Sequence, residues 1–199
     1  MTVGSSGGGE PIVMPMLREI RARLTGPLAA LPIAVGATLA FAPPAAGQTS
    51  RTECLAHHYA EFAGAARDYH RTVFRLLGEA DTTLRDLAAV GSAVQIAGVD
   101  ARQRAVEVLL QRSPQSVHVD RRVNEWLDWD RARADELSAR DSVFARLEAA
   151  ARDAQARSRD HPDWTRARRV LRDSVVSKEA YREAMSRLTA AMKATPRCG

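Results

Sequence analysis

The sequence predicts an all-α protein: an up-down-up-down antiparallel four-helix bundle with long coiled-coil-like helices, preceded by an N-terminal signal segment. Three observations predict it. From residue 51 onward Gly and Pro are sparse, whereas Ala, Leu, Arg and Glu dominate. Apolar residues in this part recur at steps of three and four, which is the spacing of one helix face. Ahead of it lies a basic stretch followed by an apolar one.

Residues 1–47 are predicted to be a signal peptide. Several Arg residues precede an apolar stretch of modest length, and small residues lead up to a cleavage point after Gly47. The basic region is unusually long, which indicates that translation starts at Met14 or Met16. The alternative is an uncleaved membrane anchor formed by residues 26–46, although this apolar run is slightly shorter than the roughly 20 residues that span a bilayer.

Four helices are predicted within residues 48–199. Gly78 is expected to end the first helix, Asp81 to cap the second, and Pro162 to open the fourth. The predicted helices cover about 52–77, 82–112, 117–158 and 162–194.

Two glycines inside the second helix call for an explanation, because each costs about 1 kcal/mol relative to Ala in a helix interior. If the first two helices form a hairpin that turns near residue 80, Gly91 lies opposite Tyr69 and Gly98 lies opposite Phe62. Each glycine would then leave space for an aromatic ring. A leucine at position 98 is accordingly expected to clash. The same counting across the next turn pairs Ala105 with Trp126 and Leu87 with Phe144.

The chain has two cysteines, Cys54 and Cys198. An even number of cysteines in an exported chain predicts a disulfide. Counting levels around four antiparallel helices brings both cysteines to the same end of the bundle. We therefore expect one intramolecular disulfide that joins the two ends of the folded chain.

The stretch around Cys54 allows a second interpretation. Cys54, His57 and His58 lie within about one helical turn, and a Cys and a His four residues apart share a helix face, as metal ligands do. The alternative function is therefore a metal- or haem-binding helical bundle that uses these three residues. No second Cys–His pair completes a known pattern, so the primary prediction includes no metal and no cofactor.

A basic segment is expected at the tip of the third and fourth helices, which the count makes longer than the other two by about ten residues, or roughly 15 Å. An Arg-rich tip could bind an anionic partner such as a membrane surface or an envelope polymer. Interleaved Asp residues make a simple solvated face the alternative. The candidate partner-binding residues are Arg157, Arg159, Trp164, Arg166, Arg168 and Arg169.

Other polar residues receive structural interpretations. Asp130 falls on the apolar seam of the third helix, where a carboxylate is either functional or paired with an Arg. Asp141 and Lys178 are expected to form an ion pair between the third and fourth helices. The scattered histidines His70, His118 and His161 are interpreted as surface residues.

The function predicted from these features is that of an exported, non-enzymatic helical bundle that acts through protein or envelope surface contacts. The sequence contains no serine-nucleophile motif, no phosphate-binding glycine loop and no paired metal motif. Nucleic acid is not expected as a partner because the net charge is only +5 and acidic residues are interleaved with Arg. The expected location is the periplasm or the extracellular space.

Overall fold

The computed structural model describes residues 46–198, and these residues form helices and turns without a strand. The predicted all-α class is confirmed. The predicted signal segment, 1–47, and the alternative anchor, 26–46, lie almost wholly outside the described residues. The helices are α1 (Ala46–Ala80), α2 (Arg85–Arg112), α3 (Arg131–Arg140), α4 (Ser142–Arg159), α5 (Trp164–Val170) and α6 (Glu179–Lys193).

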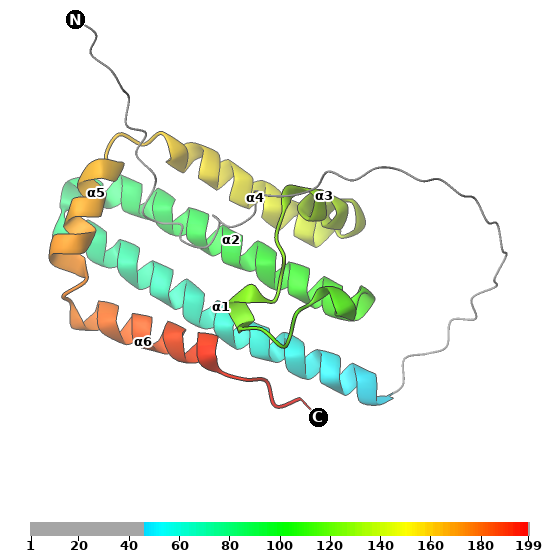
Figure 1. Ribbon diagram of the computed structural model, residues 1–199. Helices are drawn as coiled ribbons and strands as arrows, with labels where there is room; N and C mark the ends of the chain where they lie inside the picture. The colour runs from blue at the N-terminus through cyan, green and yellow to red at the C-terminus, as the bar shows by residue number, and fades with distance from the viewer. Residues whose placement is uncertain (1–45, 199) are drawn as a thin grey trace, which may run out of the picture. The chain divides into compact units, whose positions relative to one another are not determined.

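The central element is a long antiparallel hairpin of α1 and α2 (Figure 1). The chain turns through a short 3-10 segment, η1 (Thr82–Leu84), which Asp81 caps by accepting a hydrogen bond from the Thr83 backbone N at 3.1 Å. The expected cap residue was therefore identified correctly. Gly78 does not end α1, because it lies buried inside the helix, where a Cβ would be 3.4 Å from Cγ of Arg85.

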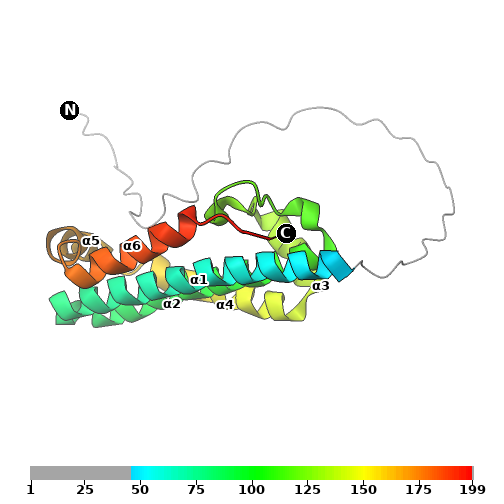
Figure 2. The same cartoon turned by 90° about the horizontal axis from the view of Figure 1, so that it is seen from below.

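The remaining helices pack around this hairpin rather than completing a regular bundle. α4 packs along α2, α6 packs along α1, and α5 crosses the end of the hairpin (Figure 1). α6 and the turn-rich segment 113–130 lie on the same side of the hairpin (Figure 2). The predicted arrangement of four uninterrupted helices is therefore not what the chain forms.

The structure differs most from the prediction in the predicted third helix, 117–158. Residues 113–130 contain only the 3-10 turns η2 (Pro114–Ser116) and η3 (Val123–Glu125), and α3 and α4 follow as separate helices. Two carboxylates define the helix starts. Asp130 accepts a hydrogen bond from the Arg133 backbone N at 2.7 Å, and Asp141 accepts one from the Phe144 backbone N at 2.7 Å. Each is an N-cap, which begins a new helix instead of continuing an old one.

The predicted fourth helix, 162–194, is also broken. A single π-helical turn, η4 (Leu171–Val175), follows α5, and Lys178 then adopts an extended conformation before α6 begins. This break lets the chain turn from the end of the hairpin and run back along α1. The expected tip that projects beyond the hairpin does not form, since α5 lies across the hairpin end instead.

Buried side chains form two separate cores. The hairpin-end core is small and comprises Phe74, Leu77, Leu84, Leu87, Ala88 and Ala167, with Trp164 packed against it. The cysteine-end core is larger and comprises Leu55, Tyr59, Ala63, Ala101, Ala105, Val106, Val108, Leu109, Leu110, Val117, Val123, Trp126, Ala134, Leu137 and Phe144.

The predicted glycine register is wrong in detail. A Cβ on Gly91 would lie 2.3 Å from the ring of Phe74, so this glycine accommodates Phe74 rather than Tyr69. A Cβ on Gly98 would have no atom within 4 Å, so no ring fills that position. The error follows from α1 continuing to Ala80, which moves the turn along the chain.

The other two predicted pairs, Leu87 with Phe144 and Ala105 with Trp126, do not form as expected between two helices. Leu87 belongs to the hairpin-end core and Phe144 to the cysteine-end core, so they do not face each other. Ala105 and Trp126 do share the cysteine-end core, although Trp126 reaches it from the turn-rich segment and not from a helix.

Candidate functional site

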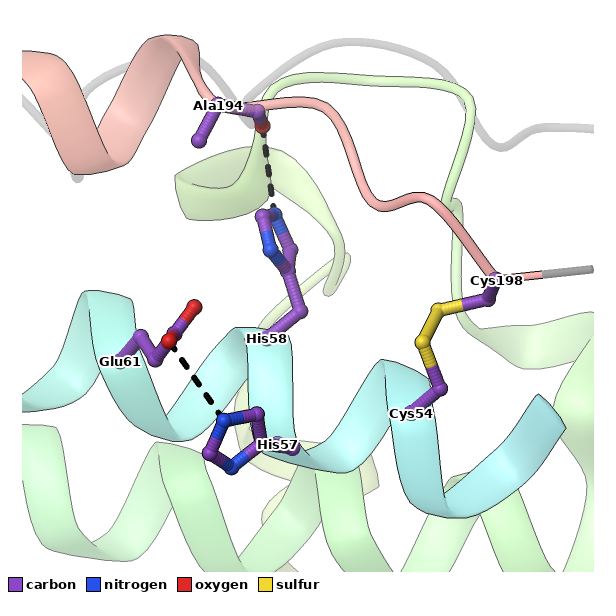
Figure 3. Close-up of a disulfide and its surroundings, with 6 residues drawn as sticks. All are labelled: Cys54, His57, His58, Glu61, Ala194 and Cys198. Carbon is purple, nitrogen blue, oxygen red and sulfur yellow. Dashed lines mark hydrogen bonds and ion pairs between the residues drawn. A yellow bond between two sulfur atoms is a disulfide. The ribbon is translucent and has the colours of Figure 1, made fainter. Parts of the chain in front are cut away.

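Cys54 and Cys198 are joined in the structure, with their sulfurs 2.06 Å apart and their Cα atoms 5.7 Å apart (Figure 3). Cys54 lies in the first turns of the described part of α1. Cys198 lies in the extended tail after α6 and packs against the cysteine-end core. The expected pairing therefore agrees with the geometry, and the bond ties the C-terminal tail to α1.

His57 and His58 point away from each other (Figure 3). His57 lies 3.5 Å from the carboxylate of Glu61 and is 77% exposed, whereas Nε2 of His58 is 3.2 Å from the carbonyl O of Ala194. The His58 ring also lies 5.7 Å from the ring of Trp126. His58 thus helps to hold the tail that carries Cys198.

This geometry does not gather the alternative metal ligands. The sulfur of Cys54 is bound to Cys198 and is not a free thiolate, which is the form that binds metals. Within residues 46–198, no group of three or more His, Cys, Asp or Glu side chains is placed to hold a metal ion.

The predicted Arg-rich tip is largely α5, and its inner face is anchored. Trp164 is half-buried against the hairpin-end core and donates its indole N–H to the carbonyl O of Ser158 at 2.6 Å. Arg166 forms an ion pair with Asp81 at 2.6 Å, which ties α5 to the hairpin turn. Thr83 and Arg166 together hold the pKa of the Asp81 carboxyl below its ordinary value, with the Thr83 hydrogen bond as the largest cause. Arg157 pairs with Asp153 within α4.

The outer face of α5 and η4 is different in character. Thr165, Arg169, Arg172 and Val176 recur at steps of three and four along this segment, and all are exposed. Arg169 forms no ion pair with the residues that the structure describes, and Arg172 pairs only with its exposed neighbour Asp173. Val176 is 46% exposed, which is unusual for a large aliphatic side chain in this structure. We call Arg169, Arg172 and Val176 the α5 outer face.

The structure corrects the predictions made for two carboxylates, Asp130 and Asp141. Asp130 is exposed at the start of α3 and is not a core carboxylate. Asp141 pairs with Arg104 of α2 at 2.7 Å, not with Lys178, which is exposed. Hydrogen bonds from Arg104 and from the Phe144 backbone lower the pKa of Asp141 to about 2.

A polar cluster in the middle of α1 was missed in the sequence. The rings of Tyr69 and Tyr181 lie 6.0 Å apart, joining α1 to α6, and His70 lies beside Tyr69. His70 is half-buried, and burial lowers its pKa to about 4. Burial and the hydrogen bond with Tyr181 raise the pKa of Tyr69. Because α6 packs on this face of α1 only through an unforeseen break at Lys178, no local signal marks the cluster.

His161 and His118 each lie close to carboxylates of nearby residues. His161 is 17% exposed and lies near Asp86 and Asp163, so the surface interpretation is wrong for it as well as for His70. His118 lies in the turn-rich segment and is 2.7 Å from the carboxylate of Asp128. The hydrogen bond from His118 is the largest cause of the lowered pKa of Asp128.

Comparison with known proteins gives no relative: no family model, no curated protein and no solved structure matches this chain. Among residues 46–198, no helix combines the length and the apolar character needed to cross a bilayer.

Proposed function

We propose that this protein is an exported, non-enzymatic helical protein that acts through surface contacts with an anionic component of the cell envelope. The α5 outer face carries the proposal. It presents two guanidinium groups beside an exposed aliphatic side chain, a combination that suits an anionic surface with apolar parts.

The anchoring of α5 supports this assignment. Trp164, Ala167 and the Arg166–Asp81 ion pair hold the inner side of the helix against the hairpin end. The outer side is therefore presented on a fixed support, which reduces the conformational entropy lost on binding. The cysteine pair is consistent with an oxidising, exported location.

The test compares two double variants. Arg169→Gln/Arg172→Gln removes the charge of the α5 outer face, while Arg131→Gln/Arg187→Gln removes two exposed charges elsewhere, with Arg131 at 86% and Arg187 at 62% exposure. Binding to phosphatidylglycerol-containing vesicles and to purified anionic envelope polymer is measured at several salt concentrations. Each Arg near an anionic membrane contributes about 1 kcal/mol, so the first variant should bind roughly 25-fold more weakly.

Both variants should melt close to the unaltered protein, because the substituted side chains are exposed. Arg166 is left in place, since its pairing with Asp81 would confuse binding with stability. Equal binding by the two variants, or no salt-sensitive binding by the unaltered protein, would remove the α5 outer face from consideration.

A further inference from the structure

A groove of about 460 Å³ lies between α1 and α2 near the hairpin end. It is separate from the α5 outer face. Its floor comes from Phe74 and Gly78 of α1 and from Ala88 and Ala89 of α2. Three arginines also line it: Arg71 and Arg75 on α1, and Arg85 on α2.

Small residues keep this groove open. The ring of Phe74 occupies the space that a side chain on Gly91 would need, since a Cβ there would lie 2.3 Å from it. Ala88, Ala89 and Ser92 on the facing helix are too short to fill the space above the ring. Phe74 and Ala88 are only 4% and 6% exposed, so the floor of this open groove consists largely of core residues between the two helices.

The charge around the groove is mainly positive. Arg71 and Arg75 pair with Asp68 and Glu79 of their own helix, and all four side chains are more than half exposed. Exposed pairs of this kind contribute little and are readily exchanged for another carboxylate. Arg85 forms no ion pair with any residue that the structure describes. Glu79 is the one acidic residue in the lining of this groove.

The shape of the groove selects the kind of partner. An open furrow between two antiparallel helices accepts a third helix, whose apolar residues at i, i+3/i+4 and i+7 enter the furrow. From Arg71 to Glu79 the furrow extends about 12 Å along α1, or roughly two helical turns.

We propose that this groove binds an acidic amphipathic helix of a partner protein. Small apolar residues of that helix would contact Phe74, Ala88 and Ala89. Its Asp and Glu residues would lie along both edges, where they would pair with the guanidinium groups of Arg71, Arg75 and Arg85 in charge-assisted hydrogen bonds. The proposal goes beyond the anionic-surface function, since it assigns a second surface and a different class of partner.

The experiment is a selection from a displayed library of helical peptides with one fixed apolar face and randomised flanking positions. The full exported chain, with its disulfide intact, is the bait. Selected peptides should be enriched in Asp and Glu at the flanks. Synthetic copies are then titrated against the unaltered protein and the variants.

Ala89→Trp fills the groove from an exposed position, and Ala150→Trp places the same side chain at an exposed site on α4. Peptide affinity should fall at least tenfold for Ala89→Trp and stay unchanged for Ala150→Trp. Arg71→Gln/Arg85→Gln should also reduce affinity at least tenfold, while Arg169→Gln/Arg172→Gln should not. Melting curves establish that every variant is folded.

Three outcomes would overturn the proposal: no enriched peptide, enrichment without acidic residues, or binding that Ala89→Trp leaves intact. Binding to anionic vesicles that depends on Arg71 and Arg85 but not on Ala89 would identify a lipid surface as the ligand instead. Because the α5 variants are tested in parallel, failure of this groove and failure of the α5 outer face give different results.

Discussion

The two cores of this protein are built in different ways. The hairpin-end core draws most of its residues from one short stretch of chain, Phe74 to Ala88, and adds Ala167 from α5. The cysteine-end core brings together residues from Leu55 to Phe144, including the turn-rich segment. The first core is therefore largely local, whereas the second depends on contacts between distant parts of the chain.

The disulfide lies at the core that depends on distant contacts. A core assembled from distant segments loses more loop entropy when it forms. Cys198 packs against the cysteine-end core, and its bond to Cys54 closes the tail over that end. The hairpin-end core has no covalent support and relies on a short turn, the Asp81 cap and the Arg166–Asp81 ion pair.

The largest expected effect on the free energy of unfolding compares Trp126 with Trp164. Trp126 is fully buried in the cysteine-end core and donates its indole N–H to the carbonyl O of Arg121, whereas Trp164 is half-buried beside the hairpin-end core. Trp126→Ala should destabilise by about 3–5 kcal/mol through the cavity it leaves, and Trp164→Ala by about 1–3 kcal/mol. Urea unfolding measures both. Equal losses would mean that α5 is as essential to the fold as the larger core.

The second effect concerns the disulfide. Cys54 and Cys198 are 144 residues apart in sequence, so the chain-entropy model gives at most about 5 kcal/mol. Cys54→Ala/Cys198→Ala should cost about 2–5 kcal/mol. Amide exchange should accelerate in the tail after Ala194 and around the cysteine-end core, but little at the hairpin end. Non-reducing peptide mapping of the purified protein should show a 54–198 cross-linked peptide. Two free thiols, or a 54–54 bond between chains, would contradict the structure.

Each core contains a feature that was predictable from the sequence. Asp81 was identifiable as a cap because it precedes an apolar helical pattern, and the α1–α2 hairpin followed from it. The cysteine pair followed from the number of cysteines and from the expectation that the chain is exported. These features depend on near neighbours or on simple counting.

The turn-rich segment was not predictable by the same means. Val123 and Trp126 are three residues apart and both buried, which resembles one face of a helix. The segment is nevertheless irregular, and the helix starts are set by Asp130 and Asp141. Residues 117–130 contain no Ala and several Val, Asp and Trp residues, which are weaker helix formers than Ala or Leu. This composition and the two caps mark the breaks locally, but the apolar spacing outweighed both in the prediction.

The third prediction tests the region between the two cores. His70 has a pKa of about 4 in the folded chain because of burial, against 6.5 for an ordinary His. Between these values the unfolded chain binds a proton and the folded chain does not, so stability should fall as the pH falls from about 6.5 to about 4. The total loss is up to about 3 kcal/mol.

A pH series of urea unfolding curves measures this loss. His70→Gln should flatten the profile between pH 6.5 and 4, and His57→Gln is the matched control because that side chain is 77% exposed in the folded state. Asp141, whose pKa is about 2, acts in a different window: its contribution is present above pH 3.8 and is lost as the pH falls toward 2. A profile that His70→Gln leaves unchanged would mean that His70 is solvated.

The smallest effects come from two glycines of α2 that should respond in opposite directions. Gly91→Ala places a Cβ 2.3 Å from the ring of Phe74, the residue shared by the hairpin-end core and the groove. The ring must move, so we expect a loss of about 1–3 kcal/mol despite better helix propensity. Gly98→Ala meets no atom within 4 Å and should stabilise by up to about 1 kcal/mol. Gly64→Ala, equally open on α1, is the matched control and should also stabilise.

Thermal unfolding of the three variants measures directly whether each substitution stabilises or destabilises the protein. If Gly98→Ala destabilised and Gly91→Ala did not, the hairpin register would be the one in which Gly98 faces Phe62, and the groove beside Phe74 would not exist in this form.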